Sequence, residues 1–378
     1  MLGLFPTYGR FDLTVESAEG VIIKDIAGKS YIDFGAGIGV SNLGHRHPAV
    51  ESAVEEQLKK YWHLSNLYPI PLQEEVAEKI TANSPASAVF FANSGAEANE
   101  AAIKLARKAT GKDKIITFEK SFHGRTFATM AATGQEKVRT GFGAMLPGFA
   151  YATYNDLESV KALADKDTAA VMIEMVQGEG GVNPGNTAFI QSLSTFCEEK
   201  DILLIIDEIQ TGMGRTGKKF AFEHYDIEPD IFTLAKGLGN GVPVGAMAAK
   251  EKLVEHFGPG THGSTFGGNP LAMAAASAVC DVIFNDAFLE QIDTSAEYLS
   301  EALSTHIAPL ESVTDIRQKG LMVGIEINAN ALNVVKELLK NGLIVLAAGE
   351  NVVRLLPPLT ISKADIDQAV ALMKDVLK

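Results

Sequence analysis

Six short runs of almost wholly apolar residues recur along the middle of the chain. They span residues 88–92, 114–118, 169–173, 202–206, 231–234 and 244–248. Side chains alternate between the two faces of a strand, so a run without polar alternation indicates a strand that is buried on both faces. Such strands are typical of parallel sheets covered by helices. We therefore predict that these runs form a mainly parallel central sheet.

Helical patterns lie between several of these runs. Residues 96–110 place apolar side chains on one helical face, and Gly111 is expected to end this helix. Residues 187–200 also place apolar side chains on one helical face. The apolar faces contain Ala98, Ala102, Leu105, Ala106 and Ala109 in the first segment, and Phe189, Leu193, Phe196 and Cys197 in the second. Strands that alternate with helices predict an α/β domain.

The two ends of the chain have a different pattern. Residues 20–34 resemble a small hairpin. An unusually apolar helix is expected after Pro270, followed by helices near 287–305 and 331–341, strands near 312–317 and 321–327, and a last helix opened by a capping box from Ser362 to Asp365. We predict that residues 1–47 and 271–378 form one smaller α+β domain beside a large domain of residues 48–270.

Composition narrows the functional classes. The chain has 33 basic and 47 acidic residues and a net charge of −14, which argues against a general nucleic-acid-binding role. No apolar run is long enough for a membrane-spanning helix, so no membrane association is expected. The two cysteines, Cys197 and Cys280, cannot make a disulfide scaffold, and they favour a reducing cytoplasm.

The junction at residues 93–96 is the first candidate for chemistry. Small residues there join an apolar run to a predicted helix, and the free backbone N–H groups of a helix N-terminus bind phosphate well. The alternative is a serine N-cap in an ordinary tight turn. Residues 263–270 offer either a second anion site or a glycine-rich hinge before the Pro270 helix.

Asp207 and Lys236 each follow a predicted strand directly. An acid at the carboxyl end of a buried parallel strand lies where α/β proteins bind ligands, and it would suit a metal, a ribose or a protonated ring nitrogen. The alternative is that Asp207 has a structural role, in a supporting ion pair or as a helix cap. Partial burial of Lys236 would lower the pKa of its amine and make the amine a nucleophile. The alternative is a loop lysine in water.

Two familiar motifs overlap at residues 212–218. The segment matches the G-x-G-x-x-G dinucleotide pattern, but the run that begins at Lys219 does not resemble a helix start. The segment also matches the first seven positions of a P-loop, but Lys219 stands where a magnesium-binding Ser or Thr is needed. No metal site is expected, since the close pair His45 and His47 lacks a third ligand at zinc spacing.

A helix N-terminus for phosphate, a carboxylate for a ring nitrogen and a lysine for an imine are together what pyridoxal 5′-phosphate (PLP) needs. Six segments also resemble class III PLP-dependent aminotransferases, in the same order, over a likeness that runs from about residue 5 to the C-terminus. They are SGAEANEAAIKLAR, SFHGRT, VQGEGGV, IDEIQTGMGRTG, LAKGLGNGVPVGA and GSTFGGNP. The resemblance implies the fold-type I PLP-dependent transferase fold.

The resemblance also implies how the cofactor ring is held. Lys236 matches the lysine that binds the cofactor covalently. Asp207 matches the acid paired with the ring nitrogen, and Gln210 matches the residue near the phenolic oxygen. Phe122 matches the aromatic residue that stacks on the ring.

The phosphate of the cofactor is implied to contact two subunits. Gly95 and Ala96 match a backbone phosphate site. Thr265 matches a residue that reaches the phosphate from the neighbouring subunit, so the resemblance implies a homodimer with shared active sites.

Four residues match substrate-binding positions. Arg125 matches the arginine that binds the carboxylate of acetylornithine, with Ser264 beside it. Glu179 and Arg354 resemble a pair that helps relatives to accept both an ω-amino substrate and 2-oxoglutarate.

Within the family the likeness is strongest to members that act on N2-acetylornithine. It implies reversible transfer of the δ-amino group to 2-oxoglutarate with ping-pong kinetics, giving N-acetylglutamate 5-semialdehyde and glutamate, as a cytoplasmic step of arginine biosynthesis. The alternative within enzymes is an aminotransferase for ornithine or another ω-amino acid. Outside this class, the alternatives are a nucleotide-binding protein that uses residues 212–218 and a cofactor-binding relative that no longer catalyses.

Overall fold

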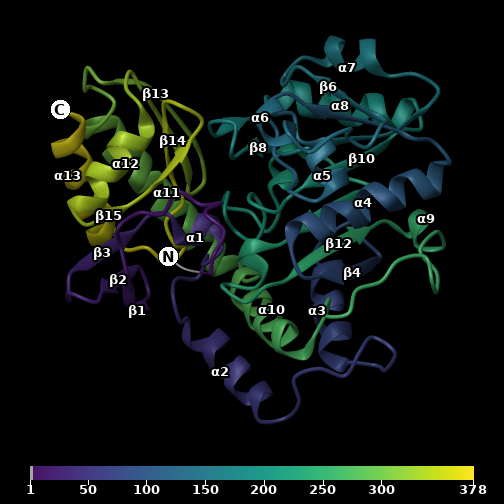
Figure 1. Ribbon diagram of the computed structural model, residues 1–378, viewed down its shortest axis with the longest axis horizontal. Helices are drawn as coiled ribbons and strands as arrows, with labels where there is room; N and C mark the ends of the chain where they lie inside the picture. The colour runs from purple at the N-terminus through teal and green to yellow at the C-terminus, as the bar shows by residue number, and fades with distance from the viewer. Residues whose placement is uncertain (1–2) are drawn as a thin grey trace.

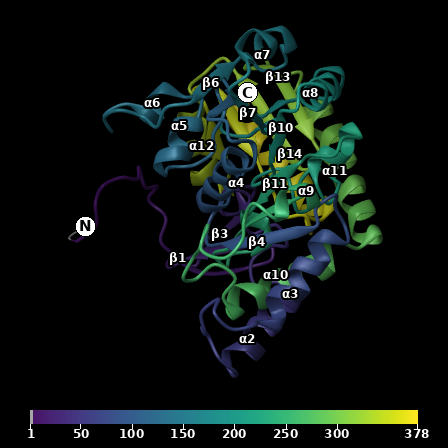
Figure 2. The same cartoon turned by 90° about the vertical axis from the view of Figure 1, so that its right-hand side faces the viewer.

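The computed structural model describes residues 3–378 and has a seven-stranded sheet at the centre of its larger lobe (Figures 1 and 2). The strand order is β4-β12-β11-β10-β7-β5-β6. The strands are β4 (Ala88–Ala92), β5 (Lys114–Phe118), β6 (Phe149–Ala152), β7 (Thr168–Ile173), β10 (Leu203–Asp207), β11 (Ile231–Leu234) and β12 (Gly245–Ala249). All six predicted runs form strands, and β6 is a seventh that the apolar pattern did not reveal.

The direction of β12 differs from the prediction. β7, β10 and β11 are parallel neighbours, but β12 runs antiparallel to both β11 and β4. A parallel return needs a crossover of about a dozen residues or more, usually a helix, and the connection at residues 235–244 is shorter than that. The sheet is therefore mainly parallel, with one reversed strand whose preceding loop carries Lys236.

Five helices of this lobe flank the sheet. They are α4 (Gly95–Thr110), α5 (Phe127–Ala132), α6 (Glu136–Arg139), α7 (Leu157–Leu163) and α8 (Thr187–Glu199). The Ser94 side chain caps α4 by accepting from Glu97 N at 3.2 Å, and Gly111 ends the helix with a φ of 66° that suits glycine. The buried face of α4 packs against β11 and β12, so its N-terminus is fixed at the edge where the strands end.

The two chain ends meet in the smaller lobe, where the purple and yellow ends of the colour scale lie together in Figure 1. One sheet joins β1 (Val15–Glu19), β2 (Ile22–Asp25) and β3 (Ser30–Asp33) to β15 (Leu343–Ile344), which runs parallel to β3. A second sheet contains β13 (Val313–Lys319), β14 (Met322–Ile327), β17 (Val352–Leu355) and β16 (Leu346–Ala348). The expected hairpin is β2–β3, and β1 extends it.

Helices complete this lobe and the base of the molecule. α11 (Asp286–His306), α12 (Ala331–Lys340) and α13 (Lys363–Leu377) belong to the smaller lobe, and the capping box of Ser362 and Asp365 is present. α10 (Pro270–Ile283) packs against α2 (Pro48–Leu58) and α3 (Pro71–Thr81), below the sheet in Figure 1. The domain boundaries at residues 47 and 270 stay a prediction. The remaining short elements are α1 (Ala36–Gly39), β8 (Val176–Gln177), β9 (Asn183–Pro184), η1 (Ala221–Tyr225), η2 (Lys236–Leu238) and α9 (Glu251–Val254).

The glycine-rich segment 212–218 is part of the junction between the lobes. Arg215 is fully buried and donates to Leu321 O at 3.0 Å, Pro357 O at 2.6 Å and Asn42 Oδ1 at 2.7 Å. One side chain thus ties the central loop to both ends of the chain. A 3₁₀ helix comes after the segment rather than an α-helix, so neither nucleotide-binding motif has its required context.

Within residues 3–378, no single helix is long and apolar enough to cross a membrane, and α10 and α11 pass that test only as a pair bent by 72°.

Candidate active site

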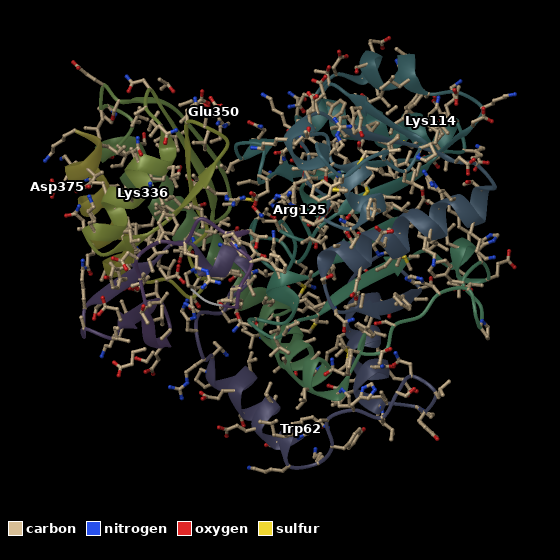
Figure 3. The ribbon with its side chains drawn as sticks, in the orientation of Figure 1. Trp62, Lys114, Arg125, Lys336, Glu350 and Asp375 are labelled. Carbon is tan, nitrogen blue, oxygen red and sulfur yellow. The ribbon has the colours of Figure 1, made fainter. Side chains whose placement is uncertain are left out.

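A cavity of about 470 Å³ lies where the parallel strands end. The carboxyl ends of parallel strands meet at one edge of a sheet, so residues far apart in sequence converge there. Arg125, labelled in Figure 3, lies between the two lobes on this side of the sheet. Eight of the predicted site residues line the cavity: Gly95, Ala96, Phe122, Arg125, Glu179, Asp207, Gln210 and Lys236.

Three predicted residues lie outside the cavity lining. Arg354, on β17, reaches the site through its contacts with Glu179 and Gln210. The Ser264 hydroxyl accepts from Nδ2 of Asn93, which does line the cavity, at 3.1 Å. Thr265 is exposed and takes no part in the lining of its own chain's cavity.

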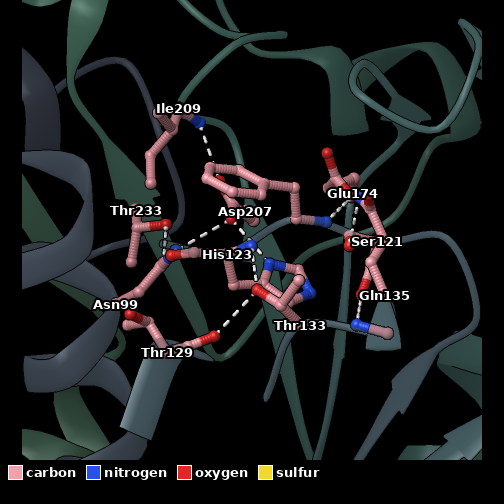
Figure 4. Close-up of polar contacts among 12 residues, drawn as sticks. Asn99, Ser121, His123, Thr129, Thr133, Gln135, Glu174, Asp207, Ile209 and Thr233 are labelled. Atoms are coloured by element: carbon pink, nitrogen blue, oxygen red, sulfur yellow. Dashed lines mark hydrogen bonds and ion pairs between the residues drawn. The ribbon is translucent and has the colours of Figure 1, made fainter. Parts of the chain in front are cut away.

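The carboxylate of Asp207 is held by three donors (Figure 4). Its Oδ2 accepts from Asn99 Nδ2 and from His123 Nδ1, each at 2.8 Å, and its Oδ1 accepts from Ile209 N at 3.0 Å. Thr233 Oγ1 donates to Asn99 Oδ1 at 2.7 Å and so fixes the orientation of that amide. Asp207 is only 4% exposed, so these donors compensate a charge that burial would otherwise disfavour.

No role in the site was predicted for four further residues, Asn99, His123, Glu174 and Thr233. Each is a buried polar residue among apolar neighbours, as Asn99 is within an alanine-rich helix face and Thr233 is within β11. A buried polar residue needs a partner, and that need is the signal that could have marked them. The sequence does not reveal which residue is the partner, because the partner lies on a different helix, strand or loop.

Lys236 begins η2, directly after β11, with a φ of 41°. Positive φ is uncommon for a residue with a side chain and marks a locally strained backbone. Burial lowers the pKa of the Lys236 amine and the charge of Arg354 lowers it further, while the negative charge of Glu179 opposes both. A lowered pKa increases the neutral fraction of the amine, which is its nucleophilic form.

A partly buried ion pair joins Arg354 of the smaller lobe to Glu179 in the cavity lining. Arg354 NH1 lies 2.7 Å from Glu179 Oε1 and 3.1 Å from Gln210 Oε1, and the Arg354 side chain is only 2% exposed. Burial alone would raise the pKa of Glu179, but the charges of Arg354 and Lys236 lower it. The carboxylate therefore stays ionised and holds the guanidinium in place.

The N-terminus of α4 also lines the cavity, and its free backbone amides form a candidate anion-binding site, here called the phosphate cradle. Ser94 satisfies the amides of Glu97 and Ala98, which leaves the amides of Gly95 and Ala96 without an acceptor among the hydrogen bonds of the described chain. A Cβ added at Gly95 would lie 2.7 Å from the Ile209 side chain, so no larger residue fits this approach. Free amides at a helix N-terminus suit a phosphate group.

These features define an α/β enzyme with an activated lysine, a fixed carboxylate and a phosphate cradle around one cavity. The family model described as aminotransferase class III matches residues 6–377. The chain belongs to the class III aminotransferases, which are PLP-dependent enzymes of fold-type I.

Individual relatives are similar over their whole length. An acetylornithine aminotransferase of Streptococcus mutans is 57% identical over 378 residues, which cover 100% of this chain and 99% of the relative. The solved ornithine aminotransferase of Toxoplasma gondii ME49 is 30% identical with a TM-score of 0.95, covering 99% and 92% of the two chains. The solved acetylornithine aminotransferase of Elizabethkingia anophelis is 35% identical with a TM-score of 0.89, covering 99% and 96%.

Gly178→Ala tests the close packing around Gln210. The added Cβ would lie 2.1 Å from Gln210 Oε1, so the amide must move away and lose its contact with Arg354. The family resemblance implies that Gln210 lies near the phenolic oxygen of PLP. We therefore expect PLP affinity to fall about tenfold, the equivalent of one hydrogen bond, with little change in the stability of the protein. Absorbance titration of apo-protein with PLP measures this, and Gly258→Ala, where nothing lies within 4 Å, is the control. Equal PLP affinity in both variants would contradict the packing argument.

Proposed function

We propose that the protein transfers the δ-amino group of N2-acetylornithine to 2-oxoglutarate and forms N-acetylglutamate 5-semialdehyde and glutamate. The observation that carries this proposal is the cavity in which Lys236, Asp207 and Arg125 converge, in a chain 57% identical to a protein named acetylornithine aminotransferase. The reaction would be a step of arginine biosynthesis. Two buried free cysteines, Cys197 and Cys280, agree with a cytoplasmic location.

The cavity fits PLP at three separate points. The unsatisfied amides of Gly95 and Ala96 would take the phosphate, and the Asp207 carboxylate would face the ring nitrogen. The Lys236 amine, which makes no hydrogen bond within residues 3–378, would bind the aldehyde covalently. Phe122 would stack on the ring, and Gln210 would lie near its phenolic oxygen.

When bound, PLP supplies an aldehyde that condenses with an amine and a pyridinium ring that withdraws electrons from the adjacent carbon. Asp207 keeps a proton on the ring nitrogen, because a nearby negative charge favours the cation. The neutral Lys236 Nζ would take up the proton of the substrate carbon and deliver it to the aldehyde carbon of the cofactor, so that the amine ends the step neutral again. Two half-reactions that share one site give ping-pong kinetics.

Arg125 and Arg354 would divide the recognition of the two substrates. The exposed Arg125 guanidinium lies 5.6 Å from the centre of the Phe122 ring, beside the place proposed for the cofactor, and its planar fork suits a carboxylate. Ser264 would support the same carboxylate. While Arg354 is paired with Glu179 at 2.7 Å, its charge is neutralised and the site would accept an ω-amino substrate. Release of Arg354 from Glu179 would leave the guanidinium free to bind a carboxylate of 2-oxoglutarate.

The protein would act as a homodimer in which Thr265 reaches the phosphate bound by the partner subunit. Large apolar side chains are exposed near this loop: Trp62 at 62%, Leu67 at 87% and Phe266 at 59%. The loops are joined, since Asn66 Nδ2 donates to Ser264 O at 3.1 Å. Exposed apolar surface of this kind marks an interface. Sedimentation should give the mass of two chains of 40.3 kDa each, and an active monomer would exclude the shared site.

Lys236→Ala should abolish covalent cofactor binding in a folded protein. Borohydride reduction should no longer fix PLP to the chain, and turnover should fall by about 10³-fold or more, since both the nucleophile and the acid–base group are lost. Mass spectrometry of the reduced protein checks the adduct. Lys200→Ala, at an exposed lysine after α8, is the control. A Lys236→Ala protein that still forms the adduct would move the role to another lysine.

The substrate is tested by kcat/KM for N2-acetylornithine, ornithine and 4-aminobutyrate. N2-acetylornithine should give the highest value. A higher value for ornithine would instead support the activity named for the structural relative with a TM-score of 0.95.

Arg125→Lys sharpens the same experiment. The KM for N2-acetylornithine should rise about 10- to 100-fold, because a lysine replaces two parallel charge-assisted hydrogen bonds by one contact, while PLP absorbance stays unchanged. Arg46→Lys, at an exposed arginine paired with Glu51, is the control. An unaltered KM would remove Arg125 from the substrate site.

A further inference from the structure

Asp207 is a buried carboxylate held by three hydrogen-bond donors. Asn99 and the Ile209 amide are neutral donors, so His123 is the one titratable donor on this carboxylate within residues 3–378. A buried carboxylate without a cation tends to take up a proton. His123 is therefore the donor that can bring a positive charge to Asp207.

His123 has an unusual environment for a histidine. Its Nδ1 lies 2.8 Å from Asp207 Oδ2, and its Nε2 is buried without any hydrogen-bond partner in the described part of the chain. The carboxylates whose charges act on His123 are Asp207, at the end of β10, and Glu174, after β7, whose Oε2 accepts from the N–H of the adjacent Phe122. Asn99 on α4 donates to His123 O, and the Thr133 hydroxyl just after α5 accepts from His123 N, so both neutral groups bond the backbone of His123.

Glu174 is a second buried acid without a cation of its own. Its Oε2 accepts from Phe122 N at 3.1 Å, and it forms no ion pair from Gly3 onward. Burial raises its pKa to about 7, the negative charges of Asp207 and Glu179 contribute to the rise, and His123 opposes it. The cavity thus contains an acid that titrates near neutral pH beside an imidazole.

We propose that His123 and Glu174 are positioning residues that keep Asp207 anionic: His123 is held as an imidazolium through neutral pH, with its Nδ1–H on Asp207 and with Glu174 as its second counter-charge. The proposal rests on the role proposed above for Asp207. It assigns a task to two buried groups that neither contact the cavity's phosphate cradle nor carry the transferred proton.

The direction of the pH effect depends on the two carboxylates. Burial alone would lower the pKa of His123, but the hydrogen bond to Asp207 and the charges of Asp207 and Glu174 raise it. Below pH about 7 Glu174 is protonated, and Asp207 alone favours the imidazolium. As the pH rises through about 7, Glu174 ionises and adds a second negative charge, so His123 keeps its proton to higher pH.

Nitrogen NMR of the histidine rings in the full-length PLP-loaded protein tests this directly. His123 should show two protonated ring nitrogens at pH 7, and its signal is assigned by its loss in His123→Asn. In Glu174→Gln the His123 titration midpoint should fall by about one unit or more, because the second counter-charge is gone. Glu208→Gln is the matched control. Glu208 is also buried with a pKa raised to about 7, but its carboxylate bonds Thr211 and Phe222 instead.

A singly protonated His123 at pH 7 in the unmodified protein would overturn the proposal, and this arm needs no variant to fold. An unchanged midpoint in Glu174→Gln would remove Glu174 from it. Because the NMR readout needs no turnover, a failure of the proposed substrate assignment would leave this result interpretable.

Kinetics separates positioning from a purely structural role. His123→Asn retains a side-chain donor for Asp207 but not the positive charge. We expect kcat to fall about tenfold, with the KM for N2-acetylornithine within about twofold of normal. Full kcat in His123→Asn would show that the charge is not needed.

Discussion

The structure depends on the burial of one carboxylate, that of Asp207, at the end of a central strand. A buried negative charge is costly unless several donors surround it. Here the donors come from α4, from the loop after β5 and from the turn after β10, and Thr233 on β11 orients the first of them. Four segments must therefore be in register before the charge is satisfied. The site and the packing of the larger lobe are in this sense one arrangement.

The turn before the reversed strand β12 carries Lys236, which lines the same cavity as Asp207. β11 ends at the same sheet edge as β10, and the chain must turn back within residues 235–244 to enter β12. Lys236 occupies the second position of this turn with a φ of 41°, which lies outside the regions that most side chains prefer. The strain is held by the strands on either side of the turn. The result is an amine that lines the cavity rather than extending into water.

Two buried arginines join the smaller lobe to the site and to the central loop. Arg354 extends from β17 to Glu179 and Gln210, and Arg215 ties the central loop to Asn42 and to the C-terminal region. Buried arginines of this kind fix geometry more than they add stability, because desolvation offsets much of the attraction. Both chain ends are thus coupled to the site. The contact of 2.7 Å between Arg354 and Glu179, which are more than 170 residues apart in the sequence, is an example of this coupling.

Local patterns in the sequence were enough to predict six of the seven strands of the central sheet, the capped helices and the positions of Lys236, Asp207 and Gly95, because these features depend on apolar runs and on junctions between neighbouring elements. Family resemblance added Arg125, Glu179 and Arg354, and the structure places the last two in contact. Tertiary packing was needed to establish the reversed direction of β12, and it also forms the network of Asn99, His123, Glu174 and Thr233 around Asp207. A buried polar residue in the sequence indicates that a partner is needed, but the partners come from distant segments, and only packing brings those segments together.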